Sequence, residues 1–149
     1  VHHDRYGIPD FPRRPVRIAG ANGDSIWEFP MTTWRVLGRN VPAAGGGWMR
    51  ALPPFVMRRA LKAAADAGTP GIVYLHPWEL DPDQPRMAGA RARTQLRHRI
   101  GLRRMHARLD RLLGAFQFGT VSDALQFVDA EPVMPGEVGV HAPTTRATA

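Results

Sequence analysis

A histidine follows an apolar run near the middle of the chain, and this is the first place where the sequence could support chemistry. Residues 72–75 read Ile-Val-Tyr-Leu, which has the β-branched and aromatic content of a buried strand, and Pro77 stops the run. The residue at the C-terminal end of such a strand faces the crevice where α/β proteins place their chemistry. His76 is therefore the first candidate for a functional residue. The alternative is a histidine whose hydrogen bonds are simply satisfied at the end of a strand.

The segments around His76 predict a layered α/β architecture. Pro53-Pro54 opens a helix that runs to about residue 67, and Gly68 is its expected C-cap. Its expected buried face consists of Phe55, Met57, Leu61 and Ala64 or Ala65. A short connection then leads into residues 71–75, which we expect to form a central parallel strand. A second helix is predicted over 101–115, because its leucines and Met105 lie on one stripe while its arginines lie off it.

The two ends of the chain contain shorter elements. Residues 16–19 and 26–29 predict a hairpin around an Asn-Gly-Asp turn, and residues 31–37 suit either a strand or a helix. Residues 116–121 fit a last short strand, after which Ser122 is the expected N-cap of a helix that ends at Phe127. From Ala130 onward Pro, Gly, Thr and Ala dominate without an apolar period. We therefore expect one domain over residues 1–129 and a disordered tail over 130–149.

The composition of the 149-residue chain limits its function less than its motifs do. A net charge of +7, carried almost entirely by arginine, could serve polyanion binding, although a bias of the coding DNA is the stronger explanation. The chain has no cysteine, which excludes disulfides and thiolate metal sites. No apolar stretch approaches the roughly 20 residues of a membrane span, and no signal peptide is visible. The location stays open, with the cytoplasm favoured.

Five motifs in one order point to a known family. They are His-Asp-Arg-Tyr-Gly-Ile-Pro at 3–9, Glu-Phe-Pro at 28–30, Gly-Arg-Asn at 38–40, Gly-Gly-Gly-Trp at 45–48 and Tyr-Leu-His-Pro-Trp-Glu at 74–79. Together they resemble the C-terminal part of polysaccharide deacetylases of the NodB-homology type, in the branch found with exosortase and PEP-CTERM exopolysaccharide loci. The resemblance runs from about residue 2 to about 127. It implies the C-terminal portion of a distorted (β/α) barrel, and the N-terminal metal-binding half as the partner of this chain.

The resemblance also implies a reaction and its participants. Such enzymes remove acetyl groups from N-acetylated oligo- or polysaccharides with a divalent metal, most often zinc. The metal ligands belong to N-terminal motifs that this sequence lacks, so we expect the full-length enzyme to hold the metal and this chain to bind none. His76 is the residue that would protonate the leaving amine, a general-acid role suited to an imidazole. Leu75 would form part of the wall of the acetyl pocket.

Other positions receive roles from the same resemblance. Trp48 would form the other wall of the pocket, and Glu28, at the end of a strand candidate, could orient His76 in place of an aspartate that the chain lacks. A strand-end glutamate is more often solvated or salt-bridged. Trp78 and Glu79 could line the sugar groove, since aromatic faces suit pyranose rings; the alternative is a loop tryptophan that closes the barrel mouth. Arg5 would contact a polar group of the substrate or a structural carboxylate.

A second class of function remains open. The chain could be a non-catalytic basic module that binds an acidic polysaccharide or nucleic acid, and the arginines of 97–111 are its best support. No stacking motif, zinc finger or recognisable nucleic-acid fold accompanies them, so we expect no nucleic-acid partner. The leading expectation is the C-terminal portion of a carbohydrate N-deacetylase of exopolysaccharide biosynthesis.

Overall fold

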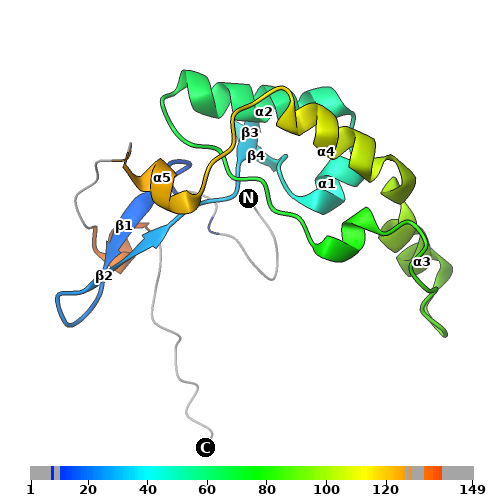
Figure 1. Ribbon diagram of the computed structural model, residues 1–149. Helices are drawn as coiled ribbons and strands as arrows, with labels where there is room; N and C mark the ends of the chain where they lie inside the picture. Colours follow the sequence, from blue (N-terminus) through cyan, green and yellow to red (C-terminus); the bar gives the residue numbers. More distant parts are fainter. Residues whose placement is uncertain (1–7, 9–10, 127, 129–132, 139–149) are drawn as a thin grey trace, which may run out of the picture.

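Two β-hairpins begin the folded chain in the computed structural model, which describes residues 8, 11–126, 128 and 133–138 (Figure 1). Strands β1 (Val16–Ala19) and β2 (Ser25–Glu28) pair antiparallel, which confirms the predicted hairpin. Strands β3 (Thr33–Val36) and β4 (Arg39–Pro42) form the second hairpin. Its two turn residues, Leu37 and Gly38, have φ of 48° and 75°, the left-handed conformation that suits a two-residue hairpin loop.

The helices pack around one apolar core. Helix α1 (Gly46–Ala51) leads into α2 (Pro54–Asp66), which begins with proline as predicted and is followed by Gly68 with φ of 67°. The main core cluster combines Ala44, in the loop before α1, with Met49 of α1, Met57 and Leu61 of α2, and Met105 and Leu112 of α4 (Met105–Leu113). Phe55, expected on the buried face of α2, is exposed, and Val56 and Ala60 are buried instead.

The predicted helix over 101–115 forms as a short 3-10 helix followed directly by α4, and a separate helix that was not predicted precedes it. Helix α3 (Ala92–Arg99) ends before Gly101, which adopts φ of 73°, and a short 3-10 helix η2 (Leu102–Arg104) precedes α4. A Cβ atom on Gly101 would lie 2.3 Å from the carbonyl oxygen of Arg50. The break therefore has a packing cause, since only glycine allows the chain to pass so close to the end of α1.

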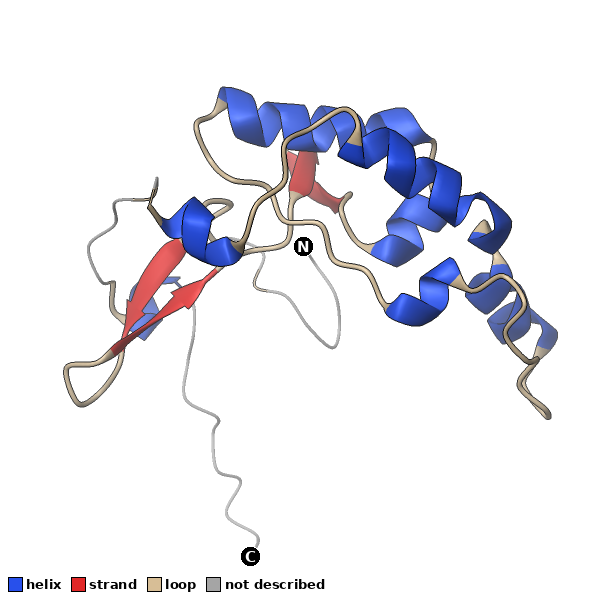
Figure 2. Ribbon diagram, viewed as in Figure 1, coloured by secondary structure: helices blue, strands red, loops and turns tan. Residues whose placement is uncertain are grey.

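Residues 72–75 are extended but do not form the expected central parallel strand. Tyr74 makes a single parallel bridge to Gly45, and the two sheets within the described residues are both two-stranded and antiparallel (Figure 2). The backbone N–H groups of alternate residues find three separate acceptors. Ile72 donates to Oγ1 of Thr32 (2.7 Å), Tyr74 to the carbonyl of Ala44 (3.0 Å) and His76 to Oε2 of Glu79 (3.0 Å). The fold is mixed α/β, and the described residues close no barrel.

The C-terminal part also differs from the expectation. Residues 116–120 are irregular rather than a strand, and α5 (Val121–Leu125) is capped by Thr120 and not by Ser122. Phe127, the expected end of that helix, lies outside the described residues. In the tail that we expected to be disordered, Val133 bridges Ile18 of β1, and a 3-10 helix η3 follows at Pro135–Val138. The rest of 130–149 lies outside the described residues.

The cap of α5 gives a pH-dependent prediction. The hydroxyl and the backbone N–H of Thr120 both donate to the carboxylate of Asp123, and they hold the pKa of Asp123 below its usual value of 3.8. This contribution to stability is therefore complete above pH 3.8 and is lost as the pH falls through the lower, folded-state pKa. We expect Thr120→Val to raise the pKa of Asp123, measured by NMR titration of the carboxyl carbon. Ser122→Ala is the matched control and should leave that pKa unchanged; an equal shift in both variants would contradict the assignment of the cap.

Candidate functional site

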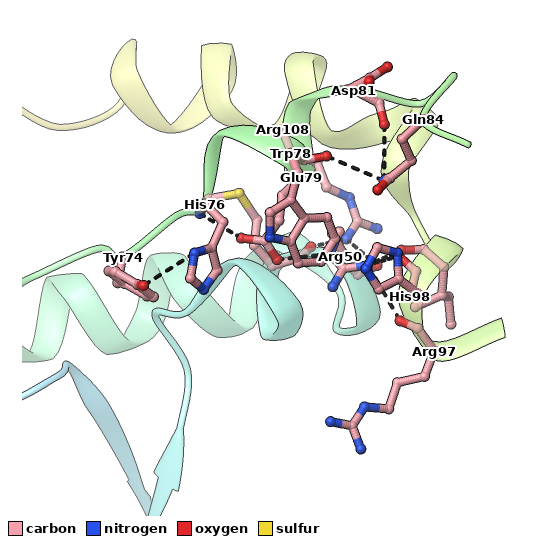
Figure 3. Close-up of polar contacts among 12 residues, drawn as sticks. Arg50, Tyr74, His76, Trp78, Glu79, Asp81, Gln84, Arg97, His98 and Arg108 are labelled. Atoms are coloured by element: carbon pink, nitrogen blue, oxygen red, sulfur yellow. Dashed lines mark hydrogen bonds and ion pairs between the residues drawn. The ribbon is translucent and has the colours of Figure 1, made fainter. Parts of the chain in front are cut away.

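Four ring side chains form a row across the surface that carries His76. Tyr74 meets His76 edge-on, with ring centroids 4.7 Å apart and planes at 77°. His76 in turn stacks with Trp78 at 5.9 Å, and Trp78 stacks with His98 at 4.4 Å (Figure 3). Tyr74 and His76 lie on one side of the extended segment, Trp78 belongs to the 3-10 helix at Pro77–Leu80 that follows it, and His98 comes from α3. We call these four residues the aromatic row.

His76 is exposed, and its ring is held from one side. The hydroxyl of Tyr74 lies 3.3 Å from Nδ1 of His76. A phenol can donate to an unprotonated Nδ1 or accept from a protonated one, so this contact is compatible with both charge states of the imidazole. Nε2 makes no hydrogen bond within the described part of the chain, and it is therefore the nitrogen through which His76 can exchange a proton with another molecule.

A buried ion pair lies beneath the aromatic row. Nε of Arg50 is 3.0 Å from Oε1 of Glu79, and the Glu79 side chain is only 2% exposed. The other oxygen, Oε2, accepts the backbone N–H of His76. Glu79 belongs to the 3-10 helix η1 (Pro77–Leu80), for which His76 is the N-cap, so the carboxylate closes its own turn while it binds α1. The backbone position of His76 is thus tied directly to the ion pair.

Arg50 connects this pair to the end of α3. Its Nη1 donates to the carbonyls of Arg97 (3.4 Å), His98 (2.7 Å) and Ile100 (3.3 Å). Its guanidinium also lies 4.9 Å from the ring centroid of Trp78, a cation–π distance. One buried side chain of α1 therefore fixes the backbone beside His98 and the ring of Trp78 together.

The structure does not bring all of the predicted site residues together. Glu28 is exposed at the end of β2, opposite Val16, and no hydrogen bond or ion pair joins it to His76 within the described part. The carboxylate beside His76 is that of Glu79, which is buried and not on a groove surface. Leu75 packs against the core cluster. Arg5 lies outside the described residues.

Trp48 lies at a different place from His76. It is partly exposed at the start of α1 and lines a cavity of about 160 Å³ together with residues of α2 and α4. Neither Leu75 nor His76 lines that cavity. The two walls that we expected around one acetyl pocket therefore do not line one cavity within the described structure.

Three members of the site were missed in the sequence. Tyr74 could have been found, because it stands two residues before His76 in a segment expected to be extended. His98 gives no local signal, because its stacking partner Trp78 lies 20 residues before it in the sequence. Arg50 has no local signal, since its carboxylate partner is 29 residues away and its other acceptors are carbonyl groups.

Within residues 11–126 and the other described positions, no group of three His, Asp or Glu side chains could hold a metal ion. The described residues therefore provide no such metal centre. None of the described helices has the length and apolar character needed to cross a membrane.

The geometry defines a small mixed α/β protein in which a buried ion pair supports an exposed histidine within an aromatic row. A family model described as a domain of unknown function, DUF3473, matches residues 1–126. The chain belongs to this family. No curated protein and no solved structure gives a significant match.

Two neighbouring glycines test the importance of the ion pair. A Cβ on Gly46 would lie 1.8 Å from Oε2 of Glu79, whereas a Cβ on Gly47 meets only Nη2 of Arg50 at 3.9 Å. We expect Gly46→Ala to lower the free energy of unfolding by about 3 kcal/mol, because the carboxylate must move away from Arg50. Gly47→Ala should raise it by up to about 1 kcal/mol through helix propensity. Urea unfolding followed by circular dichroism measures both, and equal effects would show that Glu79 relaxes freely.

Proposed function

We propose that this chain is the C-terminal portion of a metal-dependent carbohydrate N-deacetylase of the NodB-homology type, and that His76 is its general acid. The observation that carries the proposal is the geometry of His76: an exposed imidazole whose backbone N–H is held by buried Glu79 and whose Nε2 is left available. Two further points support it. The five motifs resemble that class of enzyme, and the DUF3473 family is known as a C-terminal domain associated with polysaccharide deacetylases.

The role of His76 follows from the hydrolysis of an acetamido group. Water adds to the acetyl carbonyl carbon, the C–N bond breaks, and the products are acetate and the free amine of the sugar. The departing nitrogen needs a proton at the moment of cleavage, and Nε2–H of His76 can donate it. The proton released by the attacking water then restores the imidazolium. In that charged form Nδ1–H can donate to the Tyr74 hydroxyl, which keeps the ring oriented with Nε2–H directed outward.

The neighbours of His76 act by positioning it. Trp78 stacks on His76 and His98 and faces the guanidinium of Arg50, so its ring already has partners within the chain. We therefore assign Trp78 to orienting the imidazole, and Glu79 to holding the backbone of His76, in place of the sugar-groove roles expected for both. Trp48 retains a proposed substrate-binding role, because its indole is partly exposed.

The remaining parts of such an enzyme would come from outside these residues. The metal ligands and the catalytic base of the family have no counterpart in the described structure, and the proposal assigns them to the rest of the enzyme together with the rest of the barrel. The acceptor would be an N-acetylated oligo- or polysaccharide in exopolysaccharide biosynthesis. No step of the role given to His76 passes through the metal.

His76→Ala in the complete enzyme tests the proposal. We expect the maximal rate to fall by about two to four orders of magnitude, because protonation of the leaving group is lost, while the metal content stays unchanged. Acetate release and metal analysis measure the two quantities. His106→Ala, which removes an exposed histidine of α4, is the matched control and should leave both unchanged. Loss of bound metal in the His76 variant would overturn the general-acid role.

Glu28→Gln separates the two carboxylates that could orient His76. Glu28 is exposed on the β1–β2 hairpin and has no described contact with His76. We therefore expect the pH dependence of the rate to be unchanged in this variant. A displaced basic limb of the pH profile would show that Glu28 acts on the histidine in the complete enzyme.

A further inference from the structure

A cavity of about 430 Å³ lies beside the aromatic row but is not lined by any of its four members. It is formed where the end of α1 meets the segment that joins α3 to α4. Half of its lining residues are arginines: Arg50, Arg99, Arg103, Arg104 and Arg108. No carboxylate lines it. Glu79, the buried acid nearest in the hydrogen-bond network, is already paired with Arg50.

Three of these arginines are held in place by backbone carbonyls. Besides Arg50, Arg99 donates to the carbonyls of Gln84 (2.9 Å) and Pro82 (3.3 Å). Arg108 uses Nη1 alone to reach the carbonyls at the end of α1, those of Met49, Arg50 and Leu52 (Figure 3). A guanidinium carries five N–H donors, so anchoring leaves donors on Arg99 and Arg108 for another acceptor. Side chains fixed in this way lose little conformational entropy when a ligand binds.

The other two arginines of the cavity make no contact that would give them a structural role within the described part of the chain. Arg103 and Arg104 are exposed in η2, and neither makes a hydrogen bond or an ion pair within the described part of the chain. Gly101 seats η2 against the backbone of Arg50, which places both side chains at the cavity. After the Arg50–Glu79 pair is set aside, four guanidinium charges surround the cavity without a described counter-ion.

We propose that this cavity is a binding site for a multivalent phosphate-type oxyanion, with diphosphate as the simplest ligand of that class. Arginine forks match phosphate oxygens in pairs, and several converging forks favour a ligand with several charged oxygens. A single carboxylate would leave most of the positive charge uncompensated. The volume exceeds that of one phosphate group and falls in the range of small-molecule sites, so the ligand can carry an organic substituent such as a sugar. The site does not depend on the role proposed for His76.

Calorimetric titration of the 149-residue chain with inorganic pyrophosphate, phosphate and acetate at one ionic strength tests the site. We expect pyrophosphate to bind about tenfold or more tightly than phosphate, and acetate to bind weakest. The double variant Arg103→Ala/Arg104→Ala should weaken pyrophosphate binding by about tenfold or more, because two charge-assisted donors are lost. Both residues are exposed, and circular dichroism checks that the variant folds like the parent.

The matched control is Arg93→Ala/Arg97→Ala on α3. It removes the same charge from exposed positions that do not line the cavity, and Figure 3 shows the Arg97 side chain directed away from Arg50. This variant should change pyrophosphate affinity by less than about threefold, the effect of screened charge alone. No binding of pyrophosphate to the parent chain would overturn the proposal. An equal loss of affinity in both double variants would also overturn it. Binding of heparin or an oligonucleotide without binding of pyrophosphate would do the same, because each of these two results indicates a diffuse basic surface.

Discussion

The Arg50–Glu79 pair is the interaction on which the rest of the site depends. Both charged groups of this pair are removed from water. Such burial is tolerated only when the other donors of the arginine and the other acceptors of the glutamate also find partners. Glu79 meets this condition with the N–H of His76, and Arg50 meets it with carbonyls at the end of α3 and with the ring of Trp78. One salt bridge thereby joins α1, η1 and α3, three elements whose mutual packing is otherwise slight.

The pair also explains constraints that seem unrelated along the chain. Gly46 has no room for a Cβ because the Glu79 carboxylate lies against it. Gly101 has no room for one because the backbone of Arg50 lies against it. Gly46, within the glycine run before Trp48, begins α1 and is buried. At these two positions glycine is required because another part of the chain packs directly against its Cα. The positive φ of Gly101 also ends the helical conformation between α3 and α4.

Local features could be predicted from the sequence, and long-range ones could not. The β1–β2 hairpin, the proline start of α2, its glycine cap and the buried stripe of Leu102, Met105 and Leu112 all depend on residues a few positions apart. The burial of Glu79 depends on Arg50, and a glutamate in a proline-punctuated loop gives no sign of such a partner. For the same reason Glu28 was assigned to His76, although the carboxylate that holds the histidine is three residues after it.

The failure to form a central strand at 72–75 shows how the position of His76 is set. The segment has strand-like composition, and its alternate N–H groups point to one side as in a ladder. In place of one neighbouring strand, those groups meet a buried threonine hydroxyl, a loop carbonyl and a carboxylate, at Ile72, Tyr74 and His76 in turn. Each acceptor comes from a different part of the chain. The extended segment therefore connects three parts: Thr32, the loop that precedes α1, and the 3-10 helix η1. The last of these hydrogen bonds is donated by the backbone N–H of His76. It fixes the backbone of the histidine next to the ion pair, while the imidazole ring stays exposed.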